Sequence, residues 1–397
     1  MSKLADRITH LSESQTIAMA KLSRDLQDQG YDIISLSLGE PDFITPEGIR
    51  ESAKKAIDDG FTKYSPIAGF ADLRQAISAK FKNENNLDYA PDQIVVSTGA
   101  KQSIANAVLS LVNPGEEVIV PAPYWVSYTQ MIKLAEGIPV FIPSTVATDY
   151  KITPEQLQKA ITSKSKLLIF SSPCNPSGTV YTKQELEALA RVIAEKEDLY
   201  VISDEIYEHI NFYGKHESIA QFDFIKERII VVNGVSKGYA MTGWRIGYIG
   251  APKWIAAACD KMQGQFTSGT SSISQKAATA ALQSGTGFYN QMRETYRRRR
   301  DLVVTMLQQV PGLKVNVPMG AFYVFPDVSF YFGKTDGINT ILNATDFCMF
   351  LLKDANVSMV TGEAFGDSNC VRLSYATSDE LLIKALTRVQ VSLAKLH

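Results

Sequence analysis

The chain contains few cysteines, and their spacing argues against two kinds of site. Its 397 residues include four cysteines that lie far apart, with no CxxC pair: Cys174, Cys259, Cys348 and Cys370. Paired cysteines build disulfide frameworks, and closely spaced ones build zinc sites, so the sequence indicates neither. We therefore expect no metal and a reducing compartment.

Long apolar runs and an excess of one charge are also missing. No run approaches the ~18 apolar residues of a membrane helix, and the N-terminus lacks the apolar core of a signal peptide. The formal net charge is −2 with dispersed basic residues, which argues against a nucleic-acid partner. The basic run Arg297–Arg300 is interpreted as a solvated or salt-bridged helix face. These observations predict a soluble, cytoplasmic protein with neither a membrane nor a nucleic-acid partner.

What the sequence does contain is an alternation of short apolar runs and helical patterns, beginning near Gln93. Unbroken apolar runs are typical of strands buried on both sides, and strand–helix alternation favours a mostly parallel sheet. The fold class is therefore α/β. The expected strands cover 94–97, 118–120, 140–142, 167–171, 199–203, 229–232 and 246–249.

The flanking segments predict a second, smaller α+β domain. Ser12 and Gln15 form a capping box that predicts a helix over 12–29, followed by a strand over 33–38. Thr45 and Pro46 predict the cap and first position of a helix that stops at Gly60. Beyond residue 285 come a long helix, short strands and two further helices. We expect a large domain over 46–284 and a small domain formed by 1–45 and 285–397. The later elements are expected at 288–309, 321–325, 346–353, 357–360, 371–374 and 379–395.

The central stretch Val231–Gly250, VVNGVSKGYAMTGWRIGYIG, joins two of these strands by a loop with a single lysine. Lys237 has small neighbours and follows a buried strand, so it can be partly desolvated. Desolvation lowers a lysine pKa and favours the neutral amine that attacks carbonyls. The alternative is a solvated loop lysine.

Polar segments follow four of the expected strands. In an open parallel sheet, ligands bind beyond the carboxyl ends of the strands, so these segments are expected at one edge. Gly99-Ala100-Lys101 opens a helix, where backbone N–H groups favour an anion. Each segment also has a simpler explanation, such as a helix cap at Asp204 or an ordinary turn at Asn175. The four segments are Thr98–Lys101, Pro173–Pro176, Asp204–Tyr207 and Ser236–Lys237.

The Ser-Lys pair, the small-residue gap and the Gly-Trp-Arg-Ile-Gly of the central stretch resemble the lysine segment of the class I and II aminotransferases, which are fold type I pyridoxal-phosphate enzymes. Asn175, Asp204, Lys237 and Arg372 occur in the family's order and approximate spacing, over essentially the full chain. The resemblance implies that the large domain binds pyridoxal 5′-phosphate and that Lys237 is linked to it.

The same resemblance implies the other cofactor contacts. Asp204 would pair with the pyridinium nitrogen and keep the ring protonated, so that the cofactor accepts electrons. Asn175 and Tyr207 would bond its 3-oxygen. The remaining implied contacts are Ser236, Arg245, Gly99, Ala100 and Lys101 near the phosphate, Trp125 on the ring face, and Tyr64 from a neighbouring subunit. A Trp near a strand end is otherwise usually a core residue.

For the substrate, the resemblance assigns Arg372 to the α-carboxylate, a bidentate contact that suits a planar guanidinium. An edge-strand salt bridge is the alternative. The block Gln265–Leu282 resembles the bacterial aspartate aminotransferases of subgroup Ib, in which a lysine, here Lys101, helps bind the distal carboxylate of a dicarboxylic substrate. No residue matches the partner-subunit arginine that a better-known subgroup uses for this purpose. The remaining expected substrate contacts are Thr16, Gly39, Trp125 and Asn175.

These assignments predict a homodimeric aspartate aminotransferase with ping-pong kinetics, in which the helix that carries Thr16 closes over the substrate. Three alternatives stay open: an aminotransferase for alanine, aromatic amino acids or prephenate; a pyridoxal-phosphate lyase; and a cofactor-binding regulator. The regulator is disfavoured because the sequence has no basic winged-helix segment.

Overall fold

The computed structural model describes residues 4–397, and its largest element is a seven-stranded sheet in the order β2-β8-β7-β6-β5-β3-β4. The neighbours from β7 to β4 pair in parallel, while β8 runs antiparallel to both β7 and β2. The expected mostly parallel α/β sheet is therefore confirmed. Its strands are β2 (Ile94–Ser97), β3 (Glu117–Ala122), β4 (Ile138–Pro143), β5 (Ser165–Ser171), β6 (Tyr200–Asp204), β7 (Ile229–Gly234) and β8 (Gly247–Gly250).

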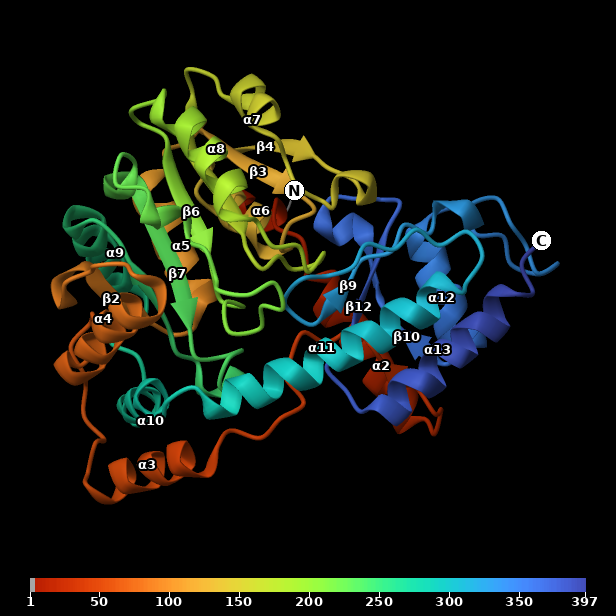
Figure 1. Cartoon of the computed structure of the whole chain (residues 1–397), viewed down its shortest axis with the longest axis horizontal. Coiled ribbons are helices and arrows are strands. Elements are labelled where there is room, and N and C mark those ends of the chain that lie inside the picture. Colours follow the sequence, from red (N-terminus) through yellow and green to blue (C-terminus); the bar gives the residue numbers. More distant parts are fainter. Residues whose placement is uncertain (1–3) are drawn as a thin grey trace.

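Helices cover both faces of this sheet (Figure 1). Successive strand residues point to opposite faces, so Val118 and Val120 join one hydrophobic core while Ile119 joins the other. This double burial explains the unbroken apolar runs within the strands. The helices around the sheet are α3 (Glu47–Asp58), α4 (Ala71–Asn85), α5 (Ala100–Leu111), α6 (Ser127–Leu134), α7 (Pro154–Ala160), α8 (Lys183–Ala194), α9 (Lys253–Phe266) and α10 (Ser272–Gln283).

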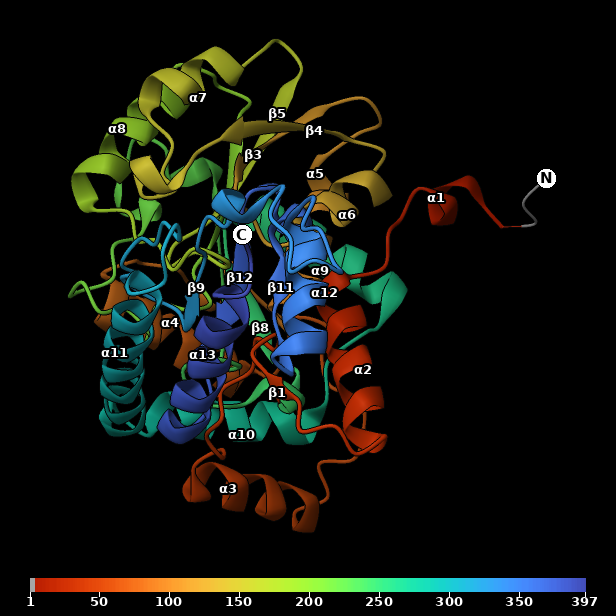
Figure 2. The same cartoon turned by 90° about the vertical axis from the view of Figure 1, so that its right-hand side faces the viewer.

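A second group of elements lies beside the large sheet and contains the C-terminus (Figures 1 and 2). Here β1 (Ile34–Ser35) pairs in parallel with β10 (Val357–Ser358), and β12 (Val371–Ser374) lies between β11 (Val360–Thr361) and β9 (Tyr323–Val324). The strand β1 therefore connects the N-terminal segment to the C-terminal elements. Domain boundaries at 46 and 284 stay a prediction. The helices of this group are α2 (Gln15–Asp28), α11 (Gly287–Gln308), α12 (Ala344–Asp354) and α13 (Asp379–Leu393), whereas the short α1 (Asp6–Thr9) projects away from it (Figure 2).

The expected boundaries near the N-terminus are wrong in detail. The helix begins at Gln15 rather than Ser12, whose backbone N–H instead donates to the side chain of Gln130, and the strand shrinks to two residues. Thr45 does not cap α3; its hydroxyl donates to the carbonyl of Ala240, 2.6 Å away, and Pro46 occupies the cap position. Distant partners thus replaced the local hydrogen bonds that the sequence pattern favoured.

All four arginines of the basic run on α11 form ion pairs with Asp or Glu, which confirms the salt-bridged interpretation, but only Arg297 and Arg298 are exposed to solvent. Arg299 is buried and bridges Asp42 and Asp379, and Arg300 is buried and donates to the carbonyl of Pro318. The four cysteines are unpaired and buried, so no disulfide framework exists among them. Over residues 4–397, the helices are too short or too polar to cross a membrane.

Candidate active site

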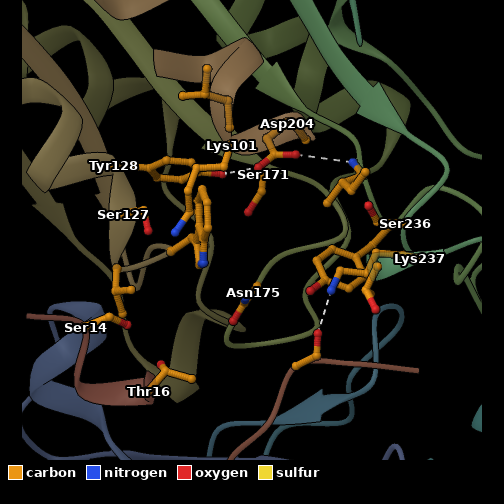
Figure 3. A pocket seen from close by; sticks show the side chains of 18 of the residues that line it. Ser14, Thr16, Lys101, Ser127, Tyr128, Ser171, Asn175, Asp204, Ser236 and Lys237 are labelled. Atoms are coloured by element: carbon orange, nitrogen blue, oxygen red, sulfur yellow. Dashed lines mark hydrogen bonds between the residues drawn. The ribbon is translucent and has the colours of Figure 1, made fainter. Parts of the chain in front are cut away.

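A cavity of about 330 Å³ opens beyond the carboxyl ends of β5, β6 and β7. It gathers most of the residues that the sequence singled out, and Figure 3 shows Asp204 and Lys237 on its walls. Two expected residues do not line it. Gly99 lies just outside, as the residue before α5, whereas Tyr64 is 100% exposed. The expected residues that line the cavity are Thr16, Gly39, Ala100, Lys101, Trp125, Asn175, Asp204, Tyr207, Ser236, Lys237, Arg245 and Arg372.

Lys237 projects into the cavity from the loop between β7 and β8. Its Nζ donates to the carbonyl oxygen of Gly39, 2.5 Å away. Burial lowers the pKa of Lys237 to about 8, and the nearby cations Arg372 and Arg245 act in the same direction, against Glu40. The amine lies in a cavity that disfavours its charged form, which argues against a fully solvated loop lysine.

Asp204, the last residue of β6, faces the cavity with an unusual electrostatic environment. Tyr128 Oη donates to its Oδ2 at 2.7 Å, and the backbone N–H of Ile206 donates to Oδ1 at 3.3 Å. The bond from Ile206 is the local capping contact that the sequence offered as the simpler explanation for Asp204. Burial nevertheless raises the pKa of Asp204 to about 6, and no cation among residues 4–397 forms an ion pair with it. A cationic ligand group would stabilise its ionised form.

The start of α5 provides an anion-binding surface. Gly99 has a φ of +85°, which favours glycine, and a Cβ there would collide with the guanidinium of Arg245. Arg245 donates to the carbonyl of Thr98 at 3.4 Å and lines the cavity with Ser236. The first N–H groups of a helix have no intrahelical acceptor, so those of Ala100 and Lys101 are available to an anion.

Arg372 lies on the central strand β12, 2% exposed, and so is not an edge-strand residue. Its Nη1 donates to Asn175 Oδ1 at 3.0 Å and its Nη2 to the carbonyl of Ser37 at 2.7 Å, while the group stacks 4.5 Å from the ring centre of Tyr323. No carboxylate among residues 4–397 pairs with Arg372, and its Nε has no hydrogen-bond partner. The salt-bridge alternative is wrong. A buried, uncompensated guanidinium instead suits a ligand carboxylate.

Lys101 and Thr16 occupy another part of the cavity wall. The ammonium group of Lys101 lies 5.0 Å from the ring centre of Trp125, and burial together with the charge of Arg245 lowers the Lys101 pKa. Thr16 and Ser14 lie across the cavity from Asp204, on the N-terminal segment (Figure 3). Lys101 and Arg372 therefore line one cavity, together with the basic side chains of Arg245 and Lys237.

Sequence reasoning missed six polar residues that line the cavity, which are Ser14, Ser127, Tyr128, Ser171, Thr242 and Tyr323. Tyr128 contacts Asp204, Tyr323 shares a 2.7 Å hydrogen bond with Tyr207, and Ser171 has a buried hydroxyl without a hydrogen-bond partner. Tyr128 follows Trp125 by three positions, a spacing that places two residues on one side of a helical turn, and this signal could have found it. Tyr323 carries no such local signal.

Three comparisons with known proteins agree with this geometry. The family described as "Aminotransferase class I and II" matches residues 31–389. A Petunia hybrida protein, the bifunctional aspartate aminotransferase and glutamate/aspartate-prephenate aminotransferase, is 47% identical over 98% of this chain and 82% of its own length. The aspartate/prephenate aminotransferase of Cereibacter sphaeroides is 45% identical over 100% of both chains.

Solved structures show the same likeness. The aspartate aminotransferase of Rhizobium meliloti superimposes with a TM-score of 0.96 at 40% identity, covering 100% of both chains. The Thermus thermophilus aspartate aminotransferase with maleate gives a TM-score of 0.93 at 41% identity, covering 99% of this chain and 100% of that one. The chain therefore belongs to the class I and II aminotransferase family, whose members use pyridoxal phosphate, and the family that the sequence resembles is confirmed.

Proposed function

We propose that this aminotransferase is a cytoplasmic aspartate aminotransferase that uses pyridoxal 5′-phosphate and transfers the amino group of L-aspartate to 2-oxoglutarate. The observation that supports this choice of substrate is the presence of Lys101 and Arg372 in one cavity with Lys237. Because Arg245 and Lys237 are assigned to the cofactor, Lys101 and Arg372 are the two basic groups left for a substrate with two carboxylates. Relatives named aspartate aminotransferase, one of them solved with the dicarboxylate maleate, support the proposal.

The cavity residues fit the proposed cofactor in three respects. The carboxylate of Asp204 is buried without a cationic partner, which suits a protonated pyridine nitrogen. The start of α5 and the guanidinium of Arg245 form a cradle that a Cβ at Gly99 would fill, which suits a phosphate. Lys237 has a depressed pKa and can form the covalent link to an aldehyde. Ser236 would help hold the phosphate, Asn175 and Tyr207 the ring oxygen, and Trp125 the ring face.

Pyridoxal phosphate supplies an electron sink that stabilises the carbanion left when the substrate Cα–H bond breaks. Lys237 Nζ takes the Cα proton as a general base and later donates a proton as a general acid, and a pKa near 8 suits both roles near neutral pH. Arg372 binds the α-carboxylate and Lys101, with Thr16, the distal one. These contacts orient the Cα–H bond toward Nζ.

The proposal includes a homodimer, because Tyr64 is fully exposed and would contribute to the phosphate site of a second copy. Tyr64→Ala is therefore expected to weaken cofactor binding in a dimer. Mixing Lys237→Ala subunits with Tyr64→Ala subunits should then raise cofactor binding above that of Tyr64→Ala alone, because each hybrid dimer contains one site with an intact Lys237 and an intact partner tyrosine. Fully active monomers in sedimentation analysis would contradict this part of the proposal.

The central experiment is an absorbance spectrum of the reconstituted enzyme, repeated after addition of aspartate alone. We expect a visible band from the lysine-linked cofactor that aspartate converts to the near-ultraviolet band of the aminated cofactor. A band that ignores aspartate would reject the substrate, and no band would reject the role of Lys237. Varying both substrates should give parallel reciprocal plots, whereas a lyase would release a β- or γ-substituent.

Lys101→Ala provides the matched test of substrate specificity. Loss of the distal cation should lower kcat/KM for aspartate by about 10²-fold but leave kcat/KM for alanine within about threefold, because alanine has no distal carboxylate. Equal losses for both amino acids would contradict the assignment.

Prephenate is a second candidate acceptor. Curated relatives are named aspartate/prephenate aminotransferase, and prephenate also carries two carboxylates that Arg372 and Lys101 can bind. Loading the enzyme with the amino group of aspartate and then adding prephenate would test it. Return of the visible band would support this second activity.

A further inference from the structure

A buried network of charged side chains lies behind the cavity, on the opposite side of the segment that carries Asp204 and Tyr207. Lys80 on α4 is 4% exposed and pairs with Glu208, and it also donates to Asn85 Oδ1 at 2.7 Å. Asn85 in turn donates to the second oxygen of Glu208, also at 2.7 Å. The ammonium of Lys80 occupies the cation position among these oxygens, so the cluster is an ion-pair network rather than a metal site.

His209 extends this network toward the loop of Lys237. Its Nε2 lies 2.8 Å from Glu84 Oε2, and because a carboxylate only accepts, this nitrogen donates. The ring stacks on Tyr289, with the ring centres 4.0 Å apart and the planes 15° apart, and meets the edge of Tyr239 at 5.6 Å. Contacts on three sides therefore hold the imidazole in one orientation.

The fourth side of the imidazole faces the backbone of Gly238, the residue that follows Lys237. A Cβ at Gly238 would collide with Nδ1, Cγ and Cβ of His209. Gly238 does not have a positive φ, so its backbone would accept alanine, and the ring alone excludes a side chain there. The ring thus limits how far this loop can move away from the cavity.

We propose that His209, anchored by Glu84 and the Lys80–Glu208 pair, is a positioning residue that holds the backbone at Gly238 and so fixes the Lys237 amino group in the cavity. This inference rests on the proposed link between Lys237 and the cofactor. Lys237 Nζ donates to the carbonyl of Gly39, and a shift of the adjacent Gly238 backbone would loosen this contact and reduce the burial of the amine. A more solvated nitrogen holds its proton more tightly, so the pKa of Lys237 Nζ would rise both in the free amine and in its link to the cofactor.

The test is a double-mutant cycle between His209 and Gly238, read in the cofactor-bound enzyme. The main readout is the pH midpoint of the visible absorbance change, supplemented by the rate of cofactor dissociation and the Tm of the cofactor-free protein. His209→Ala and Gly238→Ala should each raise the midpoint by about 0.5 pH unit or more and speed cofactor dissociation about tenfold. In the His209→Ala background, Gly238→Ala should add little, because its methyl group occupies the vacated space.

Leu351→Ala serves as the control, because Leu351 is a buried core residue of α12 that does not line the cavity. It should lower Tm without moving the midpoint. Glu84→Gln keeps the side-chain volume and loosens only the anchor, so it should move the midpoint in the same direction by a smaller amount. It keeps the test decisive where His209→Ala fails to fold.

Unchanged midpoints in folded His209→Ala or Glu84→Gln would overturn the inference and leave the network a purely stabilising role. Additive midpoint shifts from His209→Ala and Gly238→Ala would overturn it as well. If the wild-type protein forms no visible band, the proposed function fails instead, which separates the two failures.

Discussion

The segment from Asp204 to His209 presents buried polar side chains in two directions, and the two sides are built differently. Toward the cavity, Asp204 contacts only neutral donors and has a pKa raised by burial to about 6. On the opposite side, Glu205 accepts hydrogen bonds from Ser203, Ser218 and His216, and Glu208 pairs with Lys80. Burial opposes ionisation on both sides, but the pKa of Glu208 is lowered because Lys80, His209 and His216 outweigh it.

The comparison distinguishes buried charges that are available to a ligand from buried charges that are already paired within the fold. A buried charge with a partner within the chain is compensated, so removing the partner is costly, whereas a buried charge without a partner destabilises the fold until a ligand supplies one. Substituting the charged residues that face the cavity should therefore leave the free energy of unfolding unchanged or raise it. Substituting the paired residues on the opposite side should lower the free energy of unfolding, and none of those residues contacts the substrate.

The largest effect is expected for Lys237→Ala. Removing the amine that bonds the cofactor and transfers the proton should lower kcat by at least about 10⁴-fold, while the Tm of the cofactor-free protein should not fall, because a buried amine of depressed pKa is lost. Steady-state kinetics and thermal unfolding without cofactor would measure both quantities. Lys253→Ala, on the surface of α9, is the control, and a Tm drop specific to Lys237→Ala would break the comparison.

On the opposite side, Lys80→Met should reduce the free energy of unfolding by about 3–5 kcal/mol, because it leaves Glu208 buried and uncompensated. Urea unfolding of the cofactor-free protein would measure the loss. The double variant Lys80→Met/Glu208→Leu removes both charges and should recover most of it. If Lys80→Met were as stable as the wild type, the pairing of Lys80 with Glu208 would not contribute to the stability of the fold.

Asp204→Asn should stabilise the cofactor-free protein by about 2 kcal/mol at pH 7, even as it impairs catalysis. The folded-state pKa of about 6 lies above the ordinary value of 3.8 for an aspartate, so the wild-type fold loses stability as pH rises between these values. The advantage of the variant should therefore fade as pH falls toward 4. Urea midpoints across this range would show it, and a destabilised Asp204→Asn at pH 7 would contradict the comparison.

The smallest effect is expected for Tyr128→Phe, which removes the hydroxyl that donates to Asp204. Weaker stabilisation of the ionised carboxylate should lower kcat/KM by about tenfold, equivalent to roughly 1.4 kcal/mol. Tyr150→Phe is the matched control, because its hydroxyl donates to the carbonyl of Phe325 at 2.7 Å and does not line the cavity. Equal kcat/KM values in the two variants would show that the Tyr128 hydroxyl does not contribute to catalysis.

Much of the site was predictable, because each strand end and the residues that follow it are neighbours in the chain. The expected strand 94–97 coincides with β2, and 371–374 with β12. Asn175, Asp204 and Lys237 meet at one edge because parallel strands bring their carboxyl ends together. The roles assigned to these residues stay predictions until the variants are measured.

Other features could not be predicted, since they depend on partners far away in the sequence. Tyr128 and Asp204 are separated by 76 positions, and Thr45 and Ala240 by 195. No local pattern shows that Ser12 would lose its capping role, or that Arg299 and Arg300 would be buried.

By itself, the sequence determined the apolar strands, the alternation with helices and the identity of the reactive groups, because these depend on side-chain periodicity and on the intrinsic chemistry of residues such as Lys237. Only the tertiary structure decided the antiparallel insertion of β8 between β7 and β2, the isolation of Arg372 from any carboxylate in residues 4–397, and the contact of His209 with Gly238. Burial and long-range contact set these features, and through them the pKa of Lys237, because desolvation exists only once the chain has folded around the amine.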